Sequence, residues 1–195
     1  MNQKGPNGQK VAVIPGIFSG KHTARPLTKA LERAGYKVVS DTAQADIVVA
    51  HSAGCFELPA IQPHQKLMLV NPPYWPGRTA QERFHSRMRR NFHFREYGYS
   101  MQAWLVRNLW GVFYAITEPR RTRRIMRAAP AYDLESVVRG RTVLLVRNEH
   151  DDWLTPDLDQ LQKANPSLRM AHLPGDHDDI NYNPKPYVDL LQSEL

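Results

Sequence analysis

Short apolar runs alternate with stretches of helical periodicity along most of the chain. Six runs predict strands, because each holds four to six mostly aliphatic residues and is bounded by glycine, proline or polar residues. Strands that alternate with helices are typical of a parallel sheet covered on both faces. The sequence therefore predicts an α/β fold with a mostly parallel six-stranded sheet. The runs lie at residues 11–14, 36–39, 46–50, 66–70, 141–146 and 168–173.

Helices are expected between and after these strands, at about 22–34, 52–61, 156–164 and 186–195. Gly35 follows the first helix in the position of a C-terminal cap, and Thr155 with Pro156 can start the third. Only residues 40–45 join the second and third strands, whereas a parallel crossover normally takes a dozen or more residues. Either this crossover is a bare loop or the second strand lies elsewhere.

The composition is that of a globular protein, with 42% hydrophobic and 23% charged residues in a chain of 195. This length suits one domain over residues 1–195. No apolar run approaches the roughly 20 residues that cross a bilayer, and the polar first ten residues do not resemble a secretory signal. Cys55 is the single cysteine, which excludes an internal disulfide and fits a reducing compartment. We therefore expect a cytoplasmic location.

The net charge of +7 is concentrated in one segment. Residues 75–127 hold twelve arginines and three glutamates, a net charge of +9, so the rest of the chain is slightly acidic. The wider region 75–138 shows helical patterns, many aromatic residues and no strand, and we expect a helical cap inserted after the fourth strand. Its arginines favour a solvent-exposed helical face over a nucleic-acid contact.

The third strand run ends abruptly in small residues around a serine, in the sequence Ala50-His51-Ser52-Ala53-Gly54. A strand that stops in this way and continues as a helix places the serine on a sharp turn, as in the nucleophile elbow G-x-S-x-G. Ala50 stands where that pattern has its first glycine.

Other strand ends supply what a nucleophilic serine needs. The carboxyl ends of parallel strands meet at one edge of a sheet, where functional groups collect. The first strand is followed by the tight loop 15–17, the fifth by Asn-Glu-His-Asp-Asp at 148–152, and the sixth by Pro-Gly-Asp-His at 174–177. The chain order is thus oxyanion loop, serine, aspartate and histidine, which is that of α/β-hydrolases.

On these motifs the sequence resembles the α/β-hydrolase-fold serine hydrolases, and most of all the small single-domain hydrolases of the retinoblastoma-binding-protein type. The resemblance covers the chain apart from the insertion at 75–138. It implies Ser52 as nucleophile and His177 as general base. The small hydrolases place a double aspartate four residues before a proline, which favours Asp152 as the acid, with Asp151 as the alternative.

The resemblance also implies an oxyanion hole formed by the backbone N–H of Ala53 and that of Ile17, or of Phe18 in its place. The expected function is hydrolysis of a carboxylic ester or related acyl compound through an acyl-enzyme, with no metal or organic cofactor. The expected partner is a small acyl substrate, and the basic cap suits an anionic or amphipathic one; nucleic acid is not the favoured partner.

Alternatives remain at several positions. His51 is interpreted as structural or pocket-lining, and Cys55 as a core residue in preference to a nucleophile. The acidic run 176–179 can be a solvated loop or, less favoured, a metal site. The rival function is a hydrolase-like protein with an idle triad, whose basic cap binds a partner, nucleic acid or an anionic surface.

Overall fold

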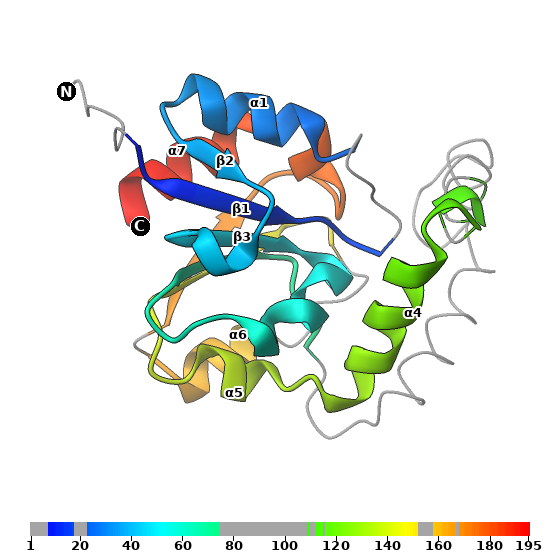
Figure 1. Ribbon diagram of the computed structural model, residues 1–195. Coiled ribbons are helices and arrows are strands. Elements are labelled where there is room, and N and C mark those ends of the chain that lie inside the picture. Colours follow the sequence, from blue (N-terminus) through cyan, green and yellow to red (C-terminus); the bar gives the residue numbers. More distant parts are fainter. Residues whose placement is uncertain are drawn as a thin grey trace.

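The computed structural model describes residues 8–17, 23–74, 109, 112–114, 116–151, 158–166 and 168–195. Their framework is a six-stranded sheet in the order β2-β1-β3-β4-β5-β6, and every neighbouring pair is parallel (Figure 1). The predicted parallel α/β architecture is therefore confirmed. The strands are β1 Lys10–Ile14, β2 Lys37–Val39, β3 Ile47–His51, β4 Lys66–Val70, β5 Val143–Asn148 and β6 Arg169–Leu173.

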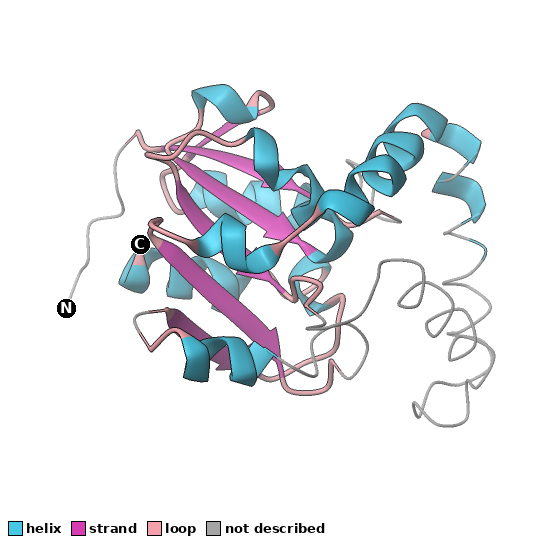
Figure 2. Ribbon diagram, turned by 90° about the horizontal axis from the view of Figure 1, so that it is seen from below, coloured by secondary structure: helices cyan, strands magenta, loops and turns pink. Residues whose placement is uncertain are grey.

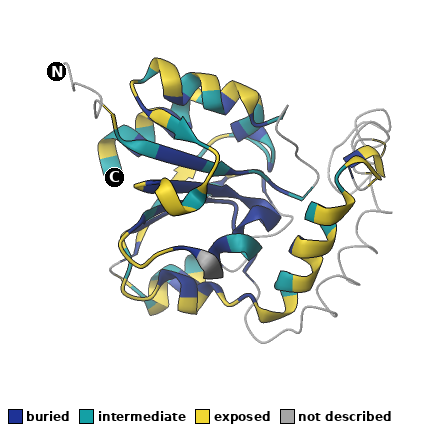
Figure 3. Ribbon diagram, in the orientation of Figure 1, coloured by how far each residue is buried: buried dark blue, intermediate teal, exposed yellow. Residues whose placement is uncertain are grey.

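Helices cover both faces of the sheet (Figure 2). Alternate strand residues point to opposite faces, so the sheet contributes side chains to two separate apolar clusters. One cluster joins the sheet to α1 (Arg25–Arg33) and α7 (Lys185–Glu194). The other joins it to the 3₁₀ helix η2 (Ser52–Ala60), α5 (Leu134–Val138) and α6 (Leu158–Ala164). The central strands are consequently buried on both sides (Figure 3).

The short crossover between β2 and β3 is a loop, as in the first of the two alternatives. The second strand lies where the sequence placed it, and β2 and β3 flank β1 on opposite sides. The connection over β1 is a loop with one 3₁₀ turn, η1 (Thr42–Gln44), in which the Asp41 side chain accepts a hydrogen bond from the N–H of Ala43. Because β2 is only three residues long and lies at the sheet edge, a short loop spans the step.

Boundaries of other elements follow the predictions closely. Gly35 has a φ of +93° just after α1, as a C-terminal cap requires. The helix after Ser52 is 3₁₀, and β5 extends two residues further than predicted, to Asn148. The predicted start of α6 at Thr155 and Pro156 lies outside the described residues.

The described part of the insertion between β4 and β5 is helical, with α4 (Pro119–Ala128), the 3₁₀ turn η4 (Ala129–Ala131) and α5. Figure 1 shows α4 beside the end of the sheet toward which the strand arrows point. Much of its surface is exposed (Figure 3), while Ile125 is fully buried. Among the residues that the structure describes, no helix is both long and apolar enough to cross a bilayer. The division into one domain with a cap at 75–138 stays a prediction.

Candidate active site

Ser52 lies at the junction between β3 and η2, in a strained backbone conformation. Its φ is +53°, in the left-handed region that L-residues other than glycine rarely adopt. Such strain persists only where the surrounding structure imposes it, and it is frequent at functional sites. The sharp strand-to-helix turn expected of a nucleophile elbow is therefore present, with alanine at position 50 fully buried in the sheet.

Two glycines bring the end of β1 directly against this turn. A Cβ atom on Gly54 would lie 2.6 Å from the carbonyl oxygens of both Ile14 and Pro15, so only glycine fits there. A Cβ atom on Gly16 would lie 3.3 Å from the Cβ of Ser52. The loop 15–17, which the sequence predicted as the oxyanion loop, thus packs on Ser52.

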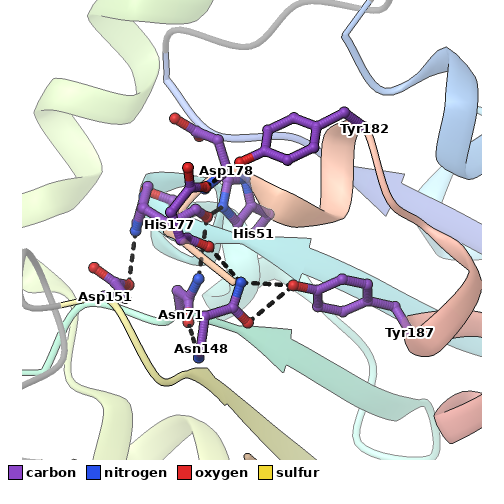
Figure 4. A network of polar contacts seen from close by, with 10 residues as sticks. His51, Asn71, Asn148, Asp151, His177, Asp178, Tyr182 and Tyr187 are labelled. Atoms are coloured by element: carbon purple, nitrogen blue, oxygen red, sulfur yellow. Dashed lines mark hydrogen bonds and ion pairs between the residues drawn. The ribbon is translucent and has the colours of Figure 1, made fainter. Parts of the chain in front are cut away.

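A chain of hydrogen bonds joins Ser52, His177 and Asp151. The Oγ of Ser52 lies 2.8 Å from Nε2 of His177. Nδ1 of His177 lies 2.7 Å from Oδ2 of Asp151, and Figure 4 shows these two residues. A carboxylate can only accept, so Nδ1 carries the proton and Nε2 is left to accept from the serine hydroxyl. All three residues are buried, with Asp151 only 1% exposed. This geometry suits proton transfer from a serine to an oriented imidazole.

The carboxylate in this chain is that of Asp151, whereas the spacing to Pro156 favoured Asp152. Directly after β5 the chain turns: the N–H of Asp151 donates to the carbonyl of Asn148 at 3.0 Å, and the N–H of His150 donates to that of Gly175 at 3.1 Å. This turn points the first aspartate at His177, one residue earlier than the spacing indicated. Asp152 itself lies outside the described residues.

His51 supports the loop that carries His177. Its Nε2–H donates to the backbone carbonyl of His177 at 2.8 Å, and the Nδ2 of Asn71 donates to the same oxygen at 3.1 Å. Burial, with a smaller contribution from the neighbouring His177, lowers the pKa of His51 to about 4. His51 is therefore neutral at physiological pH, and its role as a structural neighbour of the serine agrees with the interpretation from sequence.

A second polar network continues from this carbonyl into the fold. The Oδ1 of Asn71 accepts from the N–H of Asn148 at 2.9 Å, and the Asn148 side chain is hydrogen-bonded to the hydroxyl of Tyr187 on α7 (Figure 4). Tyr187 also donates to Asp179, two residues after His177, at 3.3 Å. Burial is the main cause of the raised pKa of both Tyr187 and Asp179. The ends of β4 and β5, the histidine loop and α7 are thereby fixed together.

Sequence reasoning missed Asn71, Asn148 and Tyr187 as parts of this site. A usable signal existed for the first two, because each lies within two residues of the end of a predicted strand, at the same edge as Ser52. Asn71 also has a φ of +48°, which asparagine tolerates better than most residues. Nothing in the periodicity of α7 distinguishes Tyr187 from an ordinary core residue.

Metal binding is the competing interpretation of this cluster. Among the described residues, potential ligand atoms of His51, His177 and Asp178 lie within 4.8 Å of one another. Both ring nitrogens of His177 are already hydrogen-bonded, to Ser52 and Asp151, so a metal ion would have to break one of these bonds. The arrangement suits proton transfer better than coordination.

Cys55 lies in the core, three residues after the serine. It is fully buried, its Sγ lies 3.7 Å from the Ala50 carbonyl, and burial raises the pKa of its thiol well above the ordinary value. A neutral thiol is a poor nucleophile. These properties match the core role expected for it.

Comparison with solved structures identifies the architecture. A hydrolase from Pseudomonas aeruginosa superposes with a TM-score of 0.65 at 16% identity, over 95% of this chain and 89% of that one. An α/β-hydrolase enzyme from a deep-sea metagenome library gives 0.64 at 13%, over 96% and 89%. The enol-lactonase of Burkholderia xenovorans gives 0.63 at 14%, over 95% and 90%. The chain has the α/β-hydrolase fold. No protein-family model matches the sequence, and no curated protein matches it significantly.

The α/β-hydrolase fold places the described candidate residues at one edge of the sheet. Ser52 follows β3, Asp151 lies three residues after β5, and His177 lies four residues after β6. The loop that holds Ile17 follows β1 at this same edge. Phe18, the alternative oxyanion donor, lies outside the described residues.

Proposed function

We propose that the protein is a serine hydrolase that cleaves a carboxylic ester or a related acyl compound. The observation that carries the proposal is the hydrogen-bonded chain Ser52–His177–Asp151 on a serine with positive φ. Among solved structures of the same fold are a carboxylesterase, a thioesterase and an enol-lactonase, which all act on acyl carbon. The double aspartate is the only feature that favours the retinoblastoma-binding-protein subgroup, and the mechanism does not depend on it.

The proposed chemistry begins with attack of the Ser52 oxygen on the acyl carbon while Nε2 of His177 accepts the hydroxyl proton. Asp151 holds the imidazole in the tautomer that can accept, and stabilises the imidazolium that forms. His177 then returns the proton to the leaving alcohol, which gives an acyl-enzyme. Water, deprotonated by the same imidazole, releases the acid and restores Ser52.

Backbone N–H groups of Ala53 and Ile17 are the proposed oxyanion donors. Ala53 is the second residue of η2, at a helix start where N–H groups lack intrahelical partners. Ile17 follows Gly16, and the close packing of Gly16 on Ser52 supports its assignment as the second donor. Each donor contributes roughly 10²–10³ in rate in known hydrolases.

A fluorophosphonate probe tests the proposal, together with hydrolysis of p-nitrophenyl esters of short and medium acyl chains. We expect labelling and turnover in the wild type, and loss of both in a folded Ser52→Ala variant. The rival function, an idle triad with a nucleic-acid-binding insertion, predicts no labelling of folded wild-type protein and salt-sensitive binding of single-stranded nucleic acid. That pair of results would refute the hydrolase.

A further inference from the structure

An arginine of the insertion that is largely shielded from solvent contacts the proposed active site. Arg121 on α4 donates from Nη2 to the backbone carbonyl of Pro15, at the end of β1. Its Nε lies 3.8 Å from Oε1 of Glu57 in η2, and its Nη1 lies 3.8 Å from Glu118. The side chains of Arg121 and Glu57 are only 18% and 17% exposed. A residue of the insertion thus contacts both segments that flank Ser52.

Glu57 supplies the negative charge that faces the arginines of α4. Its Oε2 accepts from Arg124 at 2.6 Å, while its buried Oε1 has no hydrogen-bond partner among the described residues and faces Arg121. Ion pairs that are largely shielded from water are screened less by salt than surface pairs. Removal of Arg121 would leave a buried carboxylate oxygen and a backbone carbonyl without this cation.

The orientation of the Pro15 carbonyl affects the direction of the next N–H groups of the loop. The described peptide bonds are all trans, so the Pro15 carbonyl and the Gly16 N–H point in opposite directions from one rigid plane. Arg121 donates to the Pro15 carbonyl oxygen, and Gly54 packs closely against the same oxygen, so two contacts hold this plane. The next peptide plane carries the N–H of Ile17. Rotation of the first plane would move that N–H away from the position where the oxyanion develops.

We propose that Arg121 is a positioning residue that orients the oxyanion loop, so that α4 of the insertion contributes to the competence of the site. This inference rests on the proposed hydrolase function. It gives Arg121 an effect on the transition state that the exposed arginines of α4 do not share, because donors that are positioned in advance act where charge develops.

Steady-state kinetics of Arg121→Met, Arg121→Lys and Arg123→Met test the inference with a neutral ester. Arg121→Met keeps an unbranched side chain in place of the arginine stem and loses its donors, so we expect kcat to fall about 10- to 100-fold while KM stays within about threefold. Arg121→Lys keeps a charge and one donor and should recover part of kcat. Arg123 is exposed on the same helix, and Arg123→Met should behave as wild type.

The rate of fluorophosphonate labelling gives a second readout, because phosphonylation also develops negative charge on an oxygen in the hole. It should fall in parallel with kcat, in variants whose urea unfolding shows a folded state. An active wild type with an Arg121→Met variant within twofold in kcat would overturn the inference, as would a raised KM with unchanged kcat. If Arg121→Met does not fold, Arg121→Gln decides by the same criteria. An inactive, unlabelled wild type would instead refute the hydrolase itself.

Discussion

The buried carboxylate of Asp151 holds the candidate base in one tautomer. Asparagine in its place would present an amide that can donate, which favours a proton on Nε2 and leaves His177 unable to accept from Ser52. We therefore expect Asp151→Asn to lower kcat by about 10³- to 10⁴-fold. Asp152→Asn is the matched control and should lose less than about tenfold. The reverse ranking, measured by ester hydrolysis, would transfer the role of the acid to Asp152.

The position of this acid shows where sequence reasoning ends at the residue scale. Two adjacent aspartates follow β5, and successive residues of an extended chain point in opposite directions. The choice between them depends on the turn that begins at Asn148, which is closed by hydrogen bonds to the neighbouring loop of His177. Apolar periodicity carries no information about such a turn. The sequence therefore identified both aspartates as candidates but could not decide which of them is the acid.

His51 makes stability depend on pH. Its pKa is lowered from 6.5 in the unfolded chain to about 4 in the fold, mainly by burial. The unfolded state therefore binds more protons between these values, and the free energy of unfolding decreases as pH falls from about 6.5 to about 4. The loss from this one residue is about 3 kcal/mol. Above pH 7 the residue is neutral in both states and adds no pH dependence.

Urea unfolding from pH 7 to pH 4 measures this effect. His51→Gln keeps a donor for the His177 carbonyl and cannot titrate, so its stability should fall less steeply than that of the wild type. His64 is exposed, and His64→Gln should retain the wild-type slope. Equal slopes for wild type and His51→Gln would show that other groups cause the acid destabilisation.

At the scale of elements, α7 stabilises the histidine loop through the hydroxyl of Tyr187. Tyr187→Phe would remove the hydrogen bonds to Asn148 and Asp179 and leave buried polar groups without this partner. We expect the free energy of unfolding to fall by about 1–3 kcal/mol. Tyr182 provides the control: its hydroxyl donates to Asp176, but the residue is 60% exposed, so Tyr182→Phe should change stability by less than about 0.5 kcal/mol. Similar losses in both variants would contradict the role assigned to α7.

Elements of this sheet could be predicted well because its strands are buried on both faces. Burial demands uninterrupted apolar runs, and those runs locate β3 and β4 to within one residue. The crossover at 40–45 could not be decided, because its length is explained only by the edge position of the three-residue β2. The contact of α4 with the loop after β1 could not be predicted from the sequence either, because it depends on how the insertion packs.

At the scale of the whole molecule, charges of opposite sign lie on two elements near the candidate site, α4 and the loop of His177. Arg120, Arg123 and Arg127 are exposed on α4, whereas Asp176 and Asp178 flank His177. Charges separated by more than about 10 Å are screened at 0.1 M salt, and long-range attraction of a substrate appears as a rate that falls with ionic strength. The response to salt therefore reports which of the two groups a charged substrate encounters.

We expect the arginines to dominate, because the insertion carries all of the net positive charge of the chain. The kcat/KM of an ester with a carboxylate tail should then fall several-fold between about 20 mM and 500 mM salt, while that of a neutral ester of equal length stays constant. Replacement of Arg120, Arg123 and Arg127 by glutamine should abolish the difference. Among the described residues, none of these three arginines forms an ion pair with Glu57, so the turnover of the neutral ester should not change. A kcat/KM for the anionic ester that rises with salt would mean that the aspartates beside His177 govern approach to Ser52, and would exclude anionic compounds as the preferred substrates.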